Sequence, residues 1–140
     1  MKKPHLLLLL ALAASMQSSR VHGQVLVIAN PKVEAAEISK VELRDIFTGA
    51  SSSLRGRDQV TPVLLRQGPV NDGFLDLYVG KSDSAFRAYW RSLVFSGQGV
   101  MPRSLESEAA MVDYVAHTAG AVGYVSKAAV HEGVKTLGVR

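Results

Sequence analysis

The chain has 140 residues, 16 of them basic and 12 acidic, a formal net charge of +4 and no cysteine. The lack of cysteine excludes a disulfide-stapled scaffold and a lipid-modified N-terminal cysteine. Three basic residues lie in the N-terminal segment 1–23, so the remainder carries 13 basic against 12 acidic residues and has no excess charge to attract nucleic acid.

Residues 1–23 have the pattern of a secretory signal peptide. Two lysines precede an apolar run, Leu6 to Ala14, and a polar stretch follows. The run is about half of the ~20 residues that span a bilayer, so we expect cleavage rather than membrane anchoring. The expected cut follows Gly23, with Ala13 as an alternative, and releases a protein that is periplasmic or secreted.

Residues 24–140 suffice for one domain, and their first part alternates strand and helix signals. The apolar run Val25–Ala29 predicts a strand buried on both faces. Ser39 and Glu42 have the spacing of a capping box, which predicts a helix from Lys40 to Thr48. Gly49 is placed to end that helix.

The middle of the chain predicts a loop, a strand and two helices. Serines, a glycine and alternating charges favour an exposed loop at 50–59, and a strand follows at 60–66. Pro69 suits the first turn of a helix, and Ser82-Asp83 offers a cap for another that ends near Gly97. The apolar face of this last helix is predicted to comprise Phe86, Tyr89, Trp90, Leu93 and Val94.

The last third predicts a return to strand and helix. We expect, in order, a linker at 98–103, a helix at 105–118, a strand at 121–125, one helical turn at 127–131 and a strand at 134–139. Strands that alternate with helices predict an α/β fold whose sheet is parallel at its centre.

Catalytic and metal-binding patterns are missing from this sequence. His117 and His131 are the two histidines outside the N-terminal segment, and neither has a spaced acidic companion of the kind found in metal sites. The serines at 51–53 have no candidate base near them in sequence. We therefore predict no metal, no cofactor and no enzymatic activity.

The turn after the second strand carries binding chemistry. The strand passes through Gly68 directly into a helix, so the backbone N–H groups of Val70 and Asn71 should point out at the strand's carboxyl end. Arg66 can supply two charged donors in the fork that suits phosphate or carboxylate. The alternative is that Arg66 forms a surface ion pair and Gly68 only permits the turn.

Four segments follow one another in a distinctive order: residues 40–49, 62–69, 89–91 with 95–97, and 120–125. Their sequences are KVELRDIFTG, PVLLRQGP, YWR with FSG, and GAVGYV. Together they resemble the periplasmic phosphate-binding proteins of ABC transporters, and more closely the short proteins that keep one lobe of that PBP-like fold. The resemblance runs from Val25 to Val125.

The resemblance implies a single lobe over residues 24–140, with a mixed, mostly parallel sheet flanked by helices. In that family the strand-to-helix turn supplies one side of the phosphate site, which implies ligand-binding roles for Arg66, Gly68, Val70 and Asn71. This chain has Gly68-Pro69-Val70 where the family places Ser-Gly-Thr, and proline has no N–H to donate, so weak binding is expected. We expect residues 24–140 to form one lobe, so either the ligand binds weakly on an open face or a second copy or another protein completes the cleft.

The sequence thus predicts an exported, non-enzymatic protein that binds phosphate or a related oxyanion weakly, in connection with ABC-type uptake or sensing. The alternative is a protein–protein interaction module for a transporter, a porin or a sensor ectodomain, without solute binding. Tyr89, Trp90 and Phe95 are expected as core or subunit-contact positions, so a homodimer is a further candidate assembly.

Overall fold

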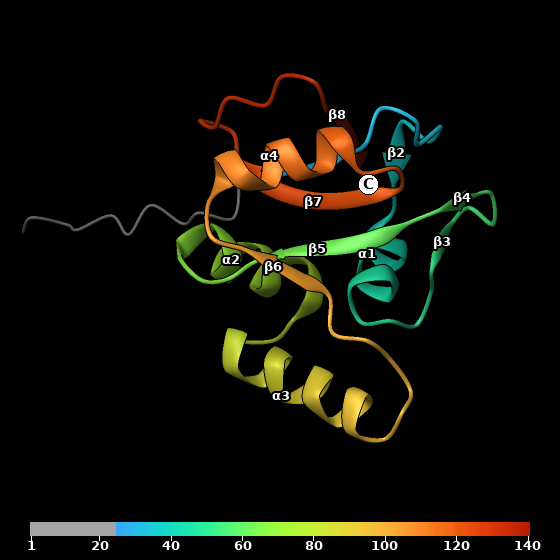
Figure 1. The fold of residues 1–140 in the computed structure, drawn as a ribbon, viewed down its shortest axis with the longest axis vertical. Coiled ribbons are helices and arrows are strands. Elements are labelled where there is room, and N and C mark those ends of the chain that lie inside the picture. Colours follow the sequence, from blue (N-terminus) through green and yellow to red (C-terminus); the bar gives the residue numbers. More distant parts are fainter. Residues whose placement is uncertain (1–24) are drawn as a thin grey trace, which may run out of the picture.

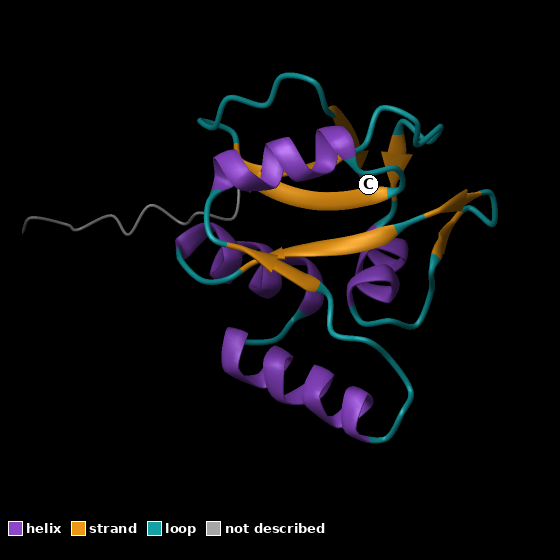
Figure 2. Ribbon diagram, viewed as in Figure 1, coloured by secondary structure: helices purple, strands orange, loops and turns teal. Residues whose placement is uncertain are grey.

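The computed structural model describes residues 25–140, which form a six-stranded sheet with helices on both faces and a small separate hairpin (Figures 1 and 2). The expected signal peptide at 1–23 lies outside the described residues, so its cleavage stays a prediction. None of the helices within residues 25–140 has both the length and the apolar content that crossing a bilayer requires.

The main sheet has the strand order β2-β8-β1-β7-β5-β6. Its strands are β1 (Val25–Ala29), β2 (Glu37–Ile38), β5 (Thr61–Leu65), β6 (Arg103–Leu105), β7 (Ala121–Ser126) and β8 (Lys135–Val139). The pairs β2–β8, β5–β7 and β5–β6 are parallel, which makes the sheet mixed and mostly parallel, as predicted. β1 runs antiparallel to both β7 and β8, so the expectation of a parallel centre is wrong. β1 is followed by β2 without an intervening helix, so it is not part of the strand–helix alternation that generates parallel pairs.

Successive residues of β7 point to opposite faces of the sheet. Gly123 faces α4 (Glu108–His117), where any added Cβ would collide with Met111. Tyr124 faces the other side, where its ring stacks on Phe74 with centroids 3.9 Å apart and meets the edge of Phe47. Both faces of β7 are therefore in the core, which confirms the predicted buried strand.

Serine is the N-cap residue of three of the α-helices. The helices are α1 (Lys40–Phe47), α2 (Pro69–Phe74), α3 (Asp83–Phe95) and α4, and α2 continues as a π-helical segment, Leu75–Val79. Ser39, Ser82 and Ser107 each accept a hydrogen bond from a backbone N–H in the first turn of α1, α3 and α4. The carboxylate of Glu42 also accepts from the Ser39 N–H at 2.8 Å, so the predicted capping box is present.

Several local predictions are wrong. The expected loop at 50–59 contains a hairpin of β3 (Ser53–Leu54) and β4 (Asp58–Gln59), because Leu54 is fully buried and holds the segment against the core. The helix expected from Leu105 begins only at Glu108, since Leu105 belongs to β6. The residues at 127–131 form a turn without a helix.

One prediction for α3 is wrong, and another is reduced to one of its alternatives. Phe86 and Trp90 are buried as expected, but Val94 is 44 % exposed and Phe95 is 96 % exposed, so neither belongs to the core. Helical geometry explains Phe95, because it lies nine residues after the buried Phe86, which at about 100° per residue places it on the opposite face of α3. Its predicted role as a subunit contact stays a prediction.

Candidate functional site

The strand-to-helix turn after β5 lies at the carboxyl edge of the parallel part of the sheet. β5 pairs in parallel with β7 on one side and with β6 on the other. The Arg66 N–H donates to the carbonyl of Leu105 at 2.9 Å, which extends the ladder to the last residue before the turn. In open α/β sheets, ligands bind outside the carboxyl ends of the strands.

Gly68 makes the turn possible and leaves the start of α2 without a side-chain cap. Its backbone has φ 109° and ψ 174°, a conformation that is essentially restricted to glycine. Pro69 occupies the first helical position and has no N–H, and the N–H groups of Val70 and Asn71 come too early in the helix for an intrahelical partner. Val70 and Asn71 follow Arg66 by four and five residues in the sequence.

Arg66 extends from this turn into solvent. Its side chain is 58 % exposed, and Nη1 lies 2.5 Å from Oε1 of Glu106, which is 69 % exposed. This is the surface ion pair that the sequence left open as an alternative. Exposed pairs of this kind contribute about 0–1 kcal/mol, so a competing anion can replace the Glu106 carboxylate at little cost.

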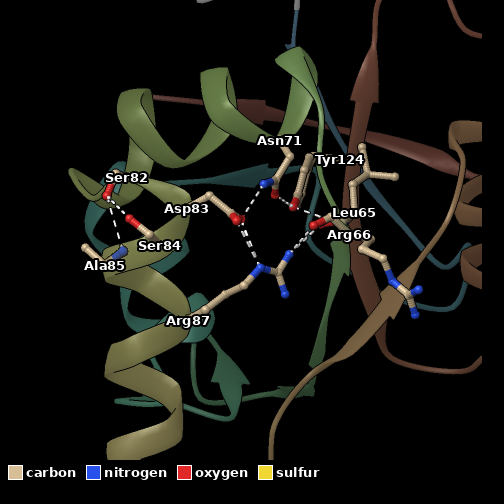
Figure 3. A network of polar contacts seen from close by, with 9 residues as sticks. All are labelled: Leu65, Arg66, Asn71, Ser82, Asp83, Ser84, Ala85, Arg87 and Tyr124. Atoms are coloured by element: carbon tan, nitrogen blue, oxygen red, sulfur yellow. Dashed lines mark hydrogen bonds and ion pairs between the residues drawn. The ribbon is translucent and has the colours of Figure 1, made fainter.

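Buried side chains fix the turn from beneath (Figure 3). The Leu65 N–H donates to the Tyr124 hydroxyl at 3.0 Å, and that hydroxyl donates to Oδ1 of Asn71 at 2.5 Å. Nδ2 of Asn71 then donates to Oδ1 of Asp83 at 2.8 Å. Burial raises the pKa of Tyr124, which keeps its hydroxyl protonated and able to donate.

Asp83 and Arg87 of α3 close this network on the end of β5. Nε of Arg87 lies 3.1 Å from both carboxylate oxygens of Asp83. Nη2 of Arg87 donates to the carbonyls of Leu65 at 3.3 Å and Arg66 at 2.5 Å (Figure 3). The guanidinium of Arg87 is thus bound to the protein itself, and it holds the backbone from which the Arg66 side chain projects.

All four predicted ligand-binding residues lie in this one turn. Asn71 as a whole residue is 1 % exposed, and its side chain is engaged with Tyr124 and Asp83, so that side chain is not available to a ligand. The sequence prediction missed Tyr124, Asp83 and Arg87 as parts of the site. The one sequence signal for any of them was the i, i+4 spacing of Asp83 and Arg87, which favours an ion pair on a helix.

The carboxylate of Asp72 also lies in the first turn of α2, where an anion would approach. Its charge opposes anion binding and adds to the effect of Glu106. Within residues 25–140, no three histidine or carboxylate side chains come close enough to hold a metal ion. A small anion is thus the ligand class that the donors of this turn suit.

Comparisons with known proteins agree with this description of the fold. The sequence matches no protein-family profile and no curated protein sequence. The structure resembles a Clostridium perfringens protein assigned as a phosphate ABC transporter substrate-binding protein and solved with bound phosphate, at a TM-score of 0.65 and 18 % identity. It also resembles an ABC-type phosphate transport receptor from Vibrio cholerae (TM-score 0.55, 15 % identity) and PstS from Borrelia burgdorferi (TM-score 0.52, 14 % identity).

These matches cover 83 %, 83 % and 84 % of this chain, in that order, but 44 %, 46 % and 47 % of the other chains. The chain spans less than half the length of the proteins that it resembles. The predicted resemblance is therefore confirmed at the level of the fold: residues 25–140 have the α/β architecture of one lobe of a phosphate ABC transporter binding protein.

Proposed function

We propose that this protein binds phosphate or a related oxyanion, weakly, at the turn from β5 into α2. One observation carries the proposal: α2 starts at a glycine with no side-chain cap, two residues after Arg66, whose side chain is exposed. The other three α-helices in residues 25–140 start with a serine that occupies a first-turn N–H. The fold of a phosphate-binding lobe supports the same ligand class.

The binding energy available at this turn is modest. Arg66 and the N–H groups of Val70 and Asn71 can form two or three charge-assisted hydrogen bonds, each worth about 1.5–3 kcal/mol. Loss of ligand and side-chain freedom offsets much of that sum. We therefore expect a dissociation constant between high micromolar and millimolar, which corresponds to about −4 to −5 kcal/mol.

Glu106 makes the affinity adjustable by mutation. In the structure its carboxylate holds the guanidinium that a phosphate would need. Replacing it by glutamine leaves a side chain of the same size without the charge. Glu106→Gln should therefore tighten phosphate binding several-fold, whereas Arg66→Ala should weaken it beyond detection at millimolar phosphate.

Calorimetric titration with phosphate and with sulfate measures both effects. Arg44→Ala is the matched control, because Arg44 is 54 % exposed on α1 and also has a carboxylate partner. That variant removes the same charge and should leave the affinity unchanged. Submicromolar binding would contradict the weak site, and affinity that is insensitive to Arg66→Ala would place the anion elsewhere.

The same proposal includes export and a role in ABC-type uptake or sensing. Residues 1–23 have the pattern of a signal peptide, and the binding-protein fold fits a non-enzymatic role outside the cytoplasm. Mass spectrometry of the exported protein should give a chain that begins at or near Gln24. An intact Met1 in a membrane fraction would contradict this part of the proposal.

A further inference from the structure

An apolar patch lies at the carboxyl end of α3. Among the large hydrophobic residues of the described chain, Val94, Phe95 and Val100 are 44 %, 96 % and 86 % exposed. They fall within seven residues, on the end of α3 and the loop toward β6, at the part of the molecule farthest from α4 (Figure 1). Val94 and Phe95 also share one hollow, and contiguous exposed apolar surface, unlike single exposed residues, marks an interaction site.

Met101 and two arginines complete a groove around this patch. Val94, Phe95 and Met101 line a hollow of about 430 Å³ together with Arg87 and Arg91. Arg87, Arg91 and Phe95 are spaced four residues apart on α3, so they lie in one row along the helix. The apolar part of the groove is thus bordered by positive charge.

The helix that carries the groove is held firmly from its other side. Nε1 of Trp90 donates to the carbonyl of Phe47 at 3.1 Å, and the Tyr89 hydroxyl donates to the carbonyl of Thr48 at 2.6 Å. Gly97, in a left-handed conformation, ends α3, and the Gln98 N–H returns to the carbonyl of Leu93. Phe95 is therefore presented by a fixed helix end.

The charges of the groove select among partners. Asp83 neutralises Arg87, but the ion pairs within residues 25–140 do not include Arg91. No carboxylate lines the groove. A symmetric dimer built on this patch would bring Arg91 of both copies into one interface whose groove lining offers no carboxylate, and like charges in an interface oppose association. A second copy of this chain is thus a poor fit.

We propose that this groove, formed by Arg87, Arg91, Val94, Phe95 and Met101, docks an acidic segment of another protein that inserts a bulky apolar side chain beside Phe95. Aromatic residues and arginine are the side chains most enriched in interface hot spots. The carboxylates of the segment would pair with Arg91, and its apolar side chain would cover Phe95. Arg87 also holds the backbone of the turn, but this role does not require that the turn binds phosphate.

A displayed library of random 12-residue peptides tests the proposal without a known partner. The wild-type chain is the bait, and the double variant Arg91→Glu/Phe95→Ser serves for counter-selection. Peptides that combine aspartate or glutamate with a large apolar residue should be enriched. An enriched peptide, measured by fluorescence polarisation, should lose at least tenfold in affinity with either single variant. Val41→Ser is the matched control, because Val41 is 58 % exposed on α1, away from the groove, and should bind as the wild type does.

Three results would overturn the proposal. The first is no enrichment over the double variant, and the second is enrichment of basic or uncharged peptides. The third is wild-type self-association that Phe95→Ser abolishes in sedimentation experiments, which would assign the groove to a second copy. Melting curves should show that both single variants keep the fold, because Phe95 and Arg91 are on the surface.

Discussion

The starts of α1 and α2 differ in what occupies their N–H groups. At α1, Ser39 and Glu42 satisfy each other's backbone donors, so a carboxylate of the chain itself already sits at the positive end of the helix. At α2, Gly68 has no side chain to offer, and the shape of the turn comes from Tyr124, Asn71, Asp83 and Arg87 beneath it. The backbone donors at the start of α1 are thus occupied by side chains of the same helix start. The donors at the start of α2 have no side-chain acceptor, and the turn is held in place by residues distant in sequence.

The largest loss of stability is expected from removing the buried hydrogen bonds beneath the start of α2. Asn71→Ala removes the shared partner of Tyr124 and Asp83 and leaves a buried hydroxyl without its acceptor. The free energy of unfolding should fall by about 2–4 kcal/mol, since each unsatisfied buried group costs about 1–3 kcal/mol. Urea unfolding measures this loss. Asp72→Ala, at the exposed neighbouring position, is the control and should stay within about 0.5 kcal/mol of the wild type.

A smaller loss of stability is expected from removing the N-cap of α1. Ser39→Ala removes the side-chain acceptor of the Glu42 N–H and should lower the free energy of unfolding by about 0.5–2 kcal/mol. Thermal or urea unfolding measures it, and phosphate affinity should not change. Equal stabilities for Ser39→Ala and the wild type would mean that the capping box contributes nothing.

The smallest effect is a pH dependence at the same helix. The Ser39 N–H donates to the carboxylate of Glu42 and lowers its pKa below the ordinary value of 4.5. The carboxylate therefore contributes stability above that value, and the contribution is lost as the pH falls through the lowered folded pKa. Between about pH 5 and about pH 3, the wild type should lose more stability than Glu42→Gln. Parallel losses in both proteins would show that Glu42 is not the group responsible.

The two helix starts also show which contacts could be predicted from the sequence and which could not. Ser39 and Glu42 lie three residues apart, so their interaction is local and could be predicted, as could the sequence of strand, Gly68 and helix around Arg66. The contacts of Tyr124 with Asn71 and of Arg87 with Leu65 join residues 53 and 22 positions apart. No local pattern encodes them, because they depend on how the sheet and α3 pack.

The errors at short strands and at α3 have related causes. β6 has three residues, too few for a period-2 pattern, and gains its place through pairing with β5. Phe95 was predicted as a core or subunit-contact position because it is aromatic, although its spacing from the buried Phe86 excludes it from the core face of the helix. Residue type outweighed position in that prediction, and the exposed groove was missed.

Backbone amide NMR during a phosphate titration tests the difference between the two helix starts most directly. The amides of Val70 and Asn71 should shift progressively, with a midpoint between high micromolar and millimolar phosphate, and the shifts should vanish in Arg66→Ala. The amides of Glu42 and Leu43, at the capped start of α1, should stay in place. Unmoved amides at Val70 and Asn71, or equal shifts at both helix starts, would contradict an oxyanion site at the β5–α2 turn.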